Sequence, residues 1–400
     1  MPFVDPQAEP ADILDFIRLC GAALWRRRLS EIQDAARSQG LGARQAQQRW
    51  ALELALARLS APGNLSRASH SERRISVLAR EAVQLAASLP AAPRRKFKDM
   101  IEAALTGDAN LVPIFHLLRT AALHRARGFD VAFGGLRDGR AHDLDIARDG
   151  VAAEVACETL SADDGREVHR GDWCALVDRV NPELQTWLAA HPGRYLLKMT
   201  LPEGMATDEQ VAELHRRIST MLAGQRRQEQ AACAVLKLDP LMLAGAQVST
   251  TRLPATLRAQ FGEEAHLAVT TAPGSGSVFV MAARAGRENS IAGAVTRRLS
   301  AAAPSRLSGE RPGILSVFVE DVDRLEWRGL RERMELEGAT RRWMTDAAAR
   351  PVVAVTCASR MELLGIAPPD AALSGELRFR NPNHPQARNT ALAAAILSSV

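Results

Sequence analysis

Two short segments with the pattern of a β-hairpin carry most of the residues that could do chemistry. Residues 142–146 and 151–160 are strand-like, and both contain acidic side chains. Arg148-Asp149-Gly150 lies between them and is a turn signal, with glycine where a positive φ is needed. A hairpin of this kind would bring acidic residues from two stretches of the chain together.

The acidic residues fall on one face of each expected strand. Asp143 and Asp145 are two positions apart, and Glu154 and Glu158 are four apart, so strand alternation puts each pair on a common face. Up to four carboxylates could therefore converge at one end of the hairpin. Metal-dependent phosphodiester cleavage uses carboxylates to hold Mg²⁺ against the phosphate, and it benefits from a nearby cation.

The elements around the hairpin resemble those of the PD-(D/E)XK, or restriction-endonuclease-like, nuclease superfamily. An apolar helix ends at Arg127-Gly128-Phe129, and a short strand, an Asp strand, a Gly turn and a Glu strand follow. The run Cys157-Glu158-Thr159-Leu160-Ser161 is similar to a segment of some bacterial members, where Glu-Cys-Lys precedes Thr-Ile-Ser. The resemblance covers residues 111–200, and residues 285–390 are weakly similar.

The resemblance implies a site for Mg²⁺ and DNA as the substrate. In that reading Asp143, Asp145 and Glu154 hold the metal, and Glu158 is a further ligand or a base that orients water. The usual catalytic lysine is missing. Ala156 stands in its place if Glu154 is the motif glutamate, whereas Glu158 stands there if Cys157 sets the register.

Arginines downstream of the hairpin are the expected substitutes for that lysine. Arg166 or Arg170 would supply a relocated catalytic cation. A glutamate at the lysine position would instead place negative charge near the phosphate, which opposes catalysis.

A structural interpretation of the same residues stands beside the catalytic one. Asp143 and Asp145 could belong to a solvated hairpin, whereas Glu154 and Glu158 lie in an apolar strand and need partners if buried. Arg140, Arg166 and Arg170 are the candidate partners. Two functions stay open: a bacterial nuclease-related protein that binds or processes DNA, with impaired or atypical chemistry, and a catalytically inactive nuclease-like scaffold acting as a protein-interaction or regulatory module.

The surrounding pattern predicts an α-helical N-terminal region over residues 1–107 and a nuclease-like α/β domain over 108–400, with a mixed sheet flanked by helices. Apolar spacing predicts N-terminal helices near 13–24, 42–60 and 71–88. These helices could dock a protein partner or form a homodimer, because the second is apolar on two faces.

The nuclease-like part begins with a helix over 111–127, on which His116 and His124 are the only candidate metal ligands. A later helix starts near Asp172 and is expected to end at Asn181-Pro182. The stretch 243–260 has the weakest pattern and is expected to be loop.

Composition limits the class of protein. The 400 residues are 46% hydrophobic and 24% charged, which is ordinary for a globular protein. The formal net charge of +5 permits nucleic-acid contact without requiring it. No signal peptide, no run of about 18 apolar residues and no zinc spacing among the five cysteines is present. We therefore expect a soluble cytoplasmic protein without a membrane partner.

Overall fold

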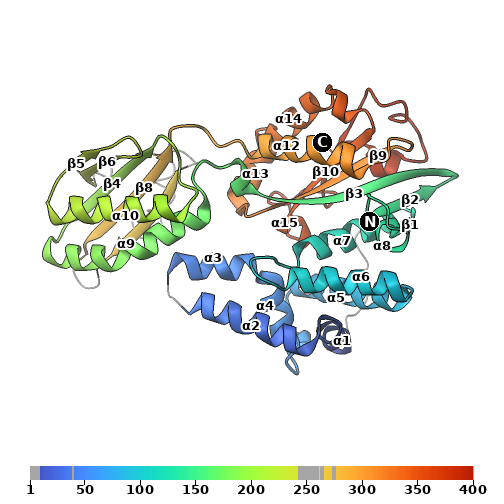
Figure 1. The fold of residues 1–400 in the computed structure, drawn as a ribbon, viewed down its shortest axis with the longest axis horizontal. Coiled ribbons are helices and arrows are strands. Elements are labelled where there is room, and N and C mark those ends of the chain that lie inside the picture. Colours follow the sequence, from blue (N-terminus) through green and yellow to red (C-terminus); the bar gives the residue numbers. More distant parts are fainter. Residues whose placement is uncertain (1–9, 38–39, 242–260, 262–264, 273–275, 400) are drawn as a thin grey trace. The chain divides into compact units, whose positions relative to one another are not determined.

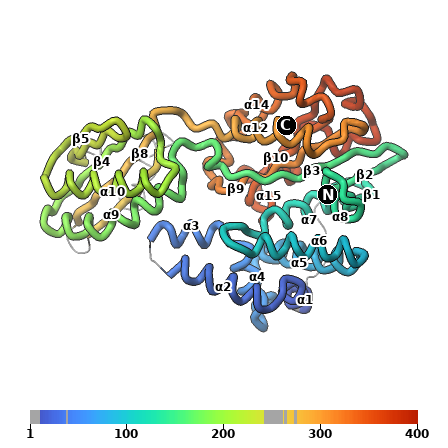
Figure 2. Tube along the Cα trace, viewed as in Figure 1, coloured from blue at the N-terminus to red at the C-terminus, as the bar shows by residue number. Residues whose placement is uncertain are grey.

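The computed structural model describes residues 10–37, 40–241, 261, 265–272 and 276–399 (Figures 1 and 2). Its contacts divide the chain into two compact units, each with its own sheet. The first unit contains residues 1–34, 47–164 and 292–400, and the second contains 35–46 and 165–291. The second unit is therefore an insertion within the chain of the first.

The described helices and strands have the following bounds. The α-helices are α1 (Pro10–Cys20), α2 (Ala22–Ala36), α3 (Leu41–Arg49), α4 (Ala51–Leu59), α5 (His70–Ser88), α6 (Ala91–Ala104), α7 (Val112–Ala126), α8 (Gly134–Arg137), α9 (Arg170–Ala190), α10 (Asp208–Ala223), α12 (Ile291–Arg306), α13 (Arg324–Glu332), α14 (Glu335–Trp343), α15 (Arg360–Leu363) and α16 (Ala393–Ile396). The strands are β1 (Asp130–Ala132), β2 (Leu144–Arg148), β3 (Val151–Ser161), β4 (Arg194–Leu201), β5 (Gln228–Gln230), β6 (Val235–Pro240), β7 (His266–Thr271), β8 (Val278–Ala285), β9 (Gly313–Glu320), β10 (Val352–Ser359) and β11 (Leu377–Arg380).

The first unit is built on a six-stranded mixed sheet with the order β1-β2-β3-β9-β10-β11. β3, β9 and β10 are parallel neighbours, and the other adjacent strands are antiparallel. Every residue of β10 is buried, and Glu320 is the single residue of β9 that is not. Continuous apolar strands of this kind are typical of parallel strands that are covered on both faces. The expected mixed α/β sheet flanked by helices is confirmed.

The N-terminal helices share a core with this sheet. The cluster of buried side chains runs from Phe16 in α1 and Leu56 in α4 through Phe115 in α7 to Val155 in β3. α5 starts at a capping box in which Ser69 and Glu72 satisfy each other's backbone N–H groups. The helical N-terminal region is thus confirmed. Its expected boundary at residue 107 does not coincide with the division of the chain, because most of these helices pack within the first unit and residues 35–46 belong to the second.

The second unit has a five-stranded mixed sheet with the order β5-β6-β4-β8-β7. β4 and β8 are parallel, and the other neighbours are antiparallel. α9 and α10 supply buried side chains to the core of this unit, together with Leu197, Leu236 and Phe279 of the sheet. A separate core explains why residues 165–291 form their own unit.

Three expected helices differ from the observed ones. The helix expected near 13–24 is two helices that break at Gly21, where φ is 86°. The single helix expected over 42–60 is two helices that break at Trp50. The helix expected to end at Asn181-Pro182 continues to Ala190, so that boundary was wrong. Leu184 and Leu188 are fully buried beyond the proline, and their packing offsets the hydrogen bond that Pro182 cannot donate.

The loop expected over 243–260 lies outside the described residues. Among the residues that are described, no helix has both the length and the apolar character that crossing a membrane requires.

Candidate functional site

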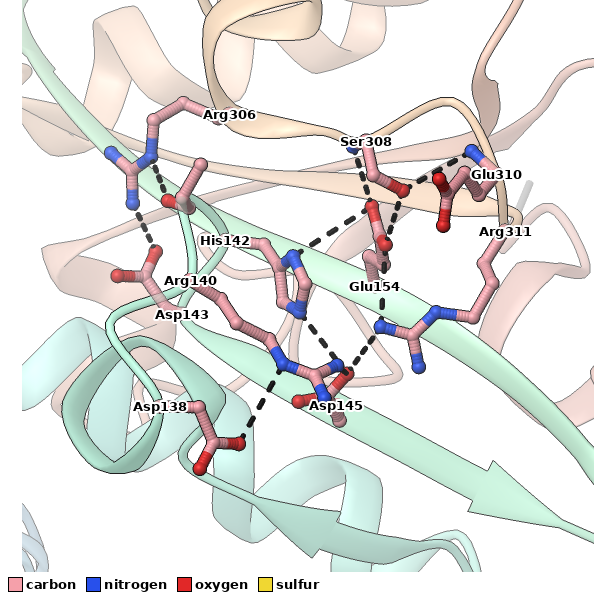
Figure 3. A network of polar contacts seen from close by, with 11 residues as sticks. Asp138, Arg140, His142, Asp143, Asp145, Glu154, Arg306, Ser308, Glu310 and Arg311 are labelled. Atoms are coloured by element: carbon pink, nitrogen blue, oxygen red, sulfur yellow. Dashed lines mark hydrogen bonds and ion pairs between the residues drawn. The ribbon is translucent and has the colours of Figure 1, made fainter.

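The acidic hairpin forms as its pattern predicts. β2 and β3 pair antiparallel, with Asp145 opposite Glu154. Asp149 and Gly150 in the turn have φ values of 50° and 76°, the left-handed geometry that a tight hairpin turn needs. Figure 3 shows Asp143, Asp145 and Glu154 next to Arg306 and Arg311, which lie far from the hairpin in sequence.

Glu154 is the most enclosed of the four carboxylates, with 1% of its surface exposed. The Ser308 backbone N–H donates to it at 2.8 Å and the Ser308 hydroxyl at 2.6 Å. Arg311 donates at 3.3 Å, and Nδ1 of His142 lies 3.7 Å away. Burial alone would raise the pKa of Glu154, but the Ser308 hydrogen bonds and the charges of His142 and Arg311 hold it below its usual value.

Asp145 sits beside Glu154 and receives three side-chain contacts at one oxygen. Arg311 donates at 2.7 Å, Arg140 donates at 2.9 Å, and Nε2 of His142 lies 3.1 Å away. Burial opposes ionisation here too, yet the hydrogen bonds from Arg311 and His142 prevail and lower the pKa of Asp145.

Asp143 and Glu158 form the second pair of carboxylates. Arg306 joins them, donating through Nη2 to Asp143 at 2.6 Å and through Nη1 to Glu158 at 2.7 Å. Asp143 also accepts from the Cys157 backbone N–H at 2.7 Å, and Arg298 lies 3.4 Å from Glu158. Burial is the largest influence on both groups and raises the pKa of Asp143 and of Glu158, although Arg306 opposes it.

Two arginines therefore occupy equivalent places along the acidic face. Arg311 lies between Asp145 and Glu154, and Arg306 lies between Asp143 and Glu158, so each guanidinium joins one carboxylate before the turn to one after it. Planar guanidinium groups suit this bridging of two carboxylates.

This arrangement does not fit Mg²⁺. A divalent cation would need carboxylate oxygens that are free to coordinate it. Here Arg306, Arg311 and Ser308 already donate to the four carboxylates. Within the part of the chain that the structure describes, no group of three or more His, Cys, Asp or Glu side chains is placed to hold a metal ion.

Two of the cationic partners, Arg306 and Arg311, come from positions that the sequence did not suggest. Arg166 and Arg170 belong to the second unit, whereas the carboxylates lie in the first. Arg306 ends α12, and Arg311 lies two residues before β9. Arg140, which the sequence suggested as a partner of Glu154 and Glu158, pairs with Asp145 and Asp138 instead.

Sequence reasoning missed Arg306 and Arg311 because nothing local links them to the hairpin. The link is the parallel pairing of β9 with β3, which sets Gly313 opposite Glu154. Arg306 alone carried a partial signal in the sequence, because it lies in the last turn of a helix, where arginine is favourable.

The two histidines of α7 are buried in the helix packing. Nε2 of His116 lies 3.0 Å from the Ser316 carbonyl oxygen in β9, and burial lowers its pKa to about 4. Burial likewise lowers the pKa of His124 to about 4, and its ring packs edge-on against Phe129. Both rings are therefore neutral at pH 7 and act as packing groups.

No protein-family model, curated protein sequence or solved structure matches this chain. Its function must be argued from the geometry of its own residues.

Proposed function

We propose that this chain is a catalytically inactive, nuclease-like scaffold that acts as an interaction or regulatory module. The observation that carries the proposal is the pair of arginine bridges, in which Arg306 and Arg311 hold the carboxylates that a metal would need. The order of α7, β1, β2, the Gly150 turn and β3 supports the likeness to the PD-(D/E)XK scaffold.

The energetics favour a stable ion-paired face over a metal site. Glu154 is buried and fully engaged, and separating it from Ser308 and Arg311 would leave a buried carboxylate with His142 alone beside it. Leaving a buried charge uncompensated costs about 3–5 kcal/mol. A metal would have to offset that cost and expel two guanidinium groups whose charge repels it.

The first test is a cleavage assay on plasmid and linear DNA with Mg²⁺ and with Mn²⁺. We expect no cleavage by the wild-type chain. Cleavage that Glu154→Ala abolishes would overturn the proposal and restore the nuclease function with a metal at Glu154. Cleavage that survives this substitution would exclude the hairpin as its source.

A second test asks directly whether the arginines exclude metal. Titration calorimetry with Mn²⁺ should show no binding at the hairpin of the wild-type chain. The double variant Arg306→Met/Arg311→Met removes both bridging charges, and Arg140→Met serves as the matched control because Arg140 contacts Asp145 alone among the four carboxylates. Binding that appears only in the double variant would support the proposal, and equal binding in wild type would contradict it.

The same protein sample can be used to test whether the chain binds DNA or another copy of itself. Metal-independent retention of duplex DNA at low salt, lost as salt rises, would favour DNA as the partner. A chain that does not retain DNA would leave a protein partner or self-association through the N-terminal helices, which light scattering of the full chain would detect as a dimer.

A further inference from the structure

A cavity lies between helices α5 and α7 of the first unit, away from the residues of the acidic hairpin. Its apolar wall is formed by Val77 and Leu78 of α5 with Leu123 of α7. Arg74 and Arg119 add positive charge to the lining. The cavity therefore combines an apolar surface with two guanidinium groups on neighbouring helices.

Arg119 is buried near the carboxylates Glu376 and Glu362, but two of its N–H groups have no acceptor among the described residues. Only 3% of the residue is exposed, and its Nη2 donates to the Gly375 carbonyl. Within the described residues, its Nε and Nη1 have no hydrogen-bond partner. Burial lowers the pKa of Arg119, the charges of Glu376 and Glu362 oppose that effect, and Arg74 adds to it. A buried donor without a partner is costly, which makes this side chain a receptive group for an anion.

The remaining polar groups leave the lining cationic. Among the described residues that line the cavity, Glu81 is the one carboxylate, and Arg125 pairs with it at 3.4 Å. His70 lines the mouth next to Arg74 and can donate a ring N–H.

A glycine loop holds the cationic side of the cavity in place. Gly365 follows α15 and has a φ of 67°, and a Cβ atom there would come within 3.0 Å of Nε2 of His70. Gly375 likewise approaches Arg119, since a Cβ atom would lie 3.7 Å from Nη2. At Gly365 the backbone can pack closely on Arg74 and His70 because the position lacks a side chain, whereas the contact at Gly375 is an ordinary one.

We propose that this cavity binds a small amphipathic anion, a molecule with one carboxylate head and a short apolar body. The head would lie near Arg74 and Arg119, where a charge-assisted hydrogen bond to guanidinium is favourable. The body would rest on Val77, Leu78 and Leu123, as in ligand sites that combine apolar walls with a few polar groups. This site does not depend on the function proposed for the hairpin.

Three probes separate the two parts of this recognition. Hexanoate carries both the carboxylate and the apolar body, 1-hexanol carries the body alone, and acetate carries the head alone. Titration calorimetry of the full chain should show saturable binding of one hexanoate per chain. Hexanol and acetate should bind at least about tenfold more weakly, because each lacks one of the two contributions.

Arg74→Met is the test variant, since methionine keeps an apolar side chain and removes the charge. It is preferred to Arg119→Met because Arg74 is only half-buried and its loss should not unfold the chain. Arg95→Met on α6 is the matched control, an exposed arginine outside the cavity. Arg74→Met should weaken hexanoate binding by about tenfold or more, the usual value of a charged hydrogen bond, and Arg95→Met should leave it unchanged.

Three results would overturn the proposal. They are the absence of saturable hexanoate binding to wild type, equal binding of hexanol and hexanoate, and equal weakening by Arg74→Met and Arg95→Met.

Discussion

Each carboxylate pair of the hairpin is bridged by one arginine, but the pKa values of the two pairs are shifted in opposite directions. The Asp145–Glu154 pair and the Asp143–Glu158 pair each accept one bridging arginine. The pKa is lowered for both members of the first pair and raised for both members of the second. The bridge alone therefore does not decide how readily these groups ionise.

One difference between the pairs is the number of additional donors. Burial raises the pKa of all four groups and is the largest influence on each. Around the first pair, Ser308, His142 and Arg140 add to the Arg311 bridge. Around the second pair, the Cys157 backbone N–H and Arg298 are the added contacts. Several short hydrogen bonds can outweigh burial, whereas a single bridging cation with fewer helpers does not.

The largest effect is expected at Glu154, where the donors concentrate. Glu154→Gln keeps the shape and removes the charge, so the Ser308 donors and Arg311 lose an ionised acceptor. We expect a loss of about 2–3 kcal/mol in the unfolding free energy. This loss would be measured by unfolding the full chain in urea and monitoring hydrogen exchange in peptides derived from the hairpin. Glu310→Gln is the control, since Glu310 is an exposed glutamate of the loop that carries Ser308 and Arg311 (Figure 3). Equal stability of the two variants would show that the Glu154 contacts contribute nothing.

Removing the second bridge should have a smaller effect. Arg306→Met leaves Asp143 and Glu158 without their shared cation, but 30% of the Arg306 side chain is exposed and water can screen the freed carboxylates. We expect a loss of about 1–2 kcal/mol in the unfolding free energy, between the values for an exposed ion pair and for a buried one. The same hydrogen-exchange measurement applies. A loss as large as that of Glu154→Gln would mean that the two pairs contribute equally to stability.

Acidification should change the contributions of the two pairs to the unfolding free energy in opposite directions. Asp145 has a lowered pKa in the folded chain, so it stabilises the fold above its unfolded pKa, and this contribution is lost as pH falls through the folded value. Glu158 has a raised pKa, so its contribution is present below its unfolded pKa and is lost as pH rises through the folded value.

The unfolding free energy at neutral pH and in mild acid would test these signs. On acidification Asp145→Asn should lose less stability than wild type, and Glu158→Gln should lose more. The same acid response in both variants would remove the distinction between the pairs.

The smallest effect is expected at Arg298. Its side chain is 45% exposed and lies 3.4 Å from Glu158, so Arg298→Met should change the unfolding free energy by no more than about 0.5 kcal/mol. High salt should reduce even this difference, because exposed charges are screened. Arg298 also donates to the Thr159 carbonyl, so a loss comparable to that of Arg306→Met would show that its contacts to Glu158 and Thr159 together match the Arg306 bridge.

Local pattern was sufficient for the hairpin itself. Alternation placed Asp143, Asp145, Glu154 and Glu158 on one face, and the Asp149-Gly150 turn set the pairing of β2 with β3. These features depend on residues within about twenty positions of one another, where strand geometry and turn chemistry act directly. The helix before the hairpin was predictable for the same reason.

The tertiary structure decided which charges meet those carboxylates. Arg166 and Arg170 are near the hairpin in sequence but belong to the second unit, whereas Arg306 and Arg311 are about 150 residues away and contact it. The parallel pairing of β9 with β3 brings them there, across an inserted unit. A local pattern cannot encode such a pairing, because parallel strands are joined by a crossover and their register depends on the packing of the whole sheet. The amino-acid sequence by itself thus determined an acidic hairpin, and the fold made it an arginine-paired one.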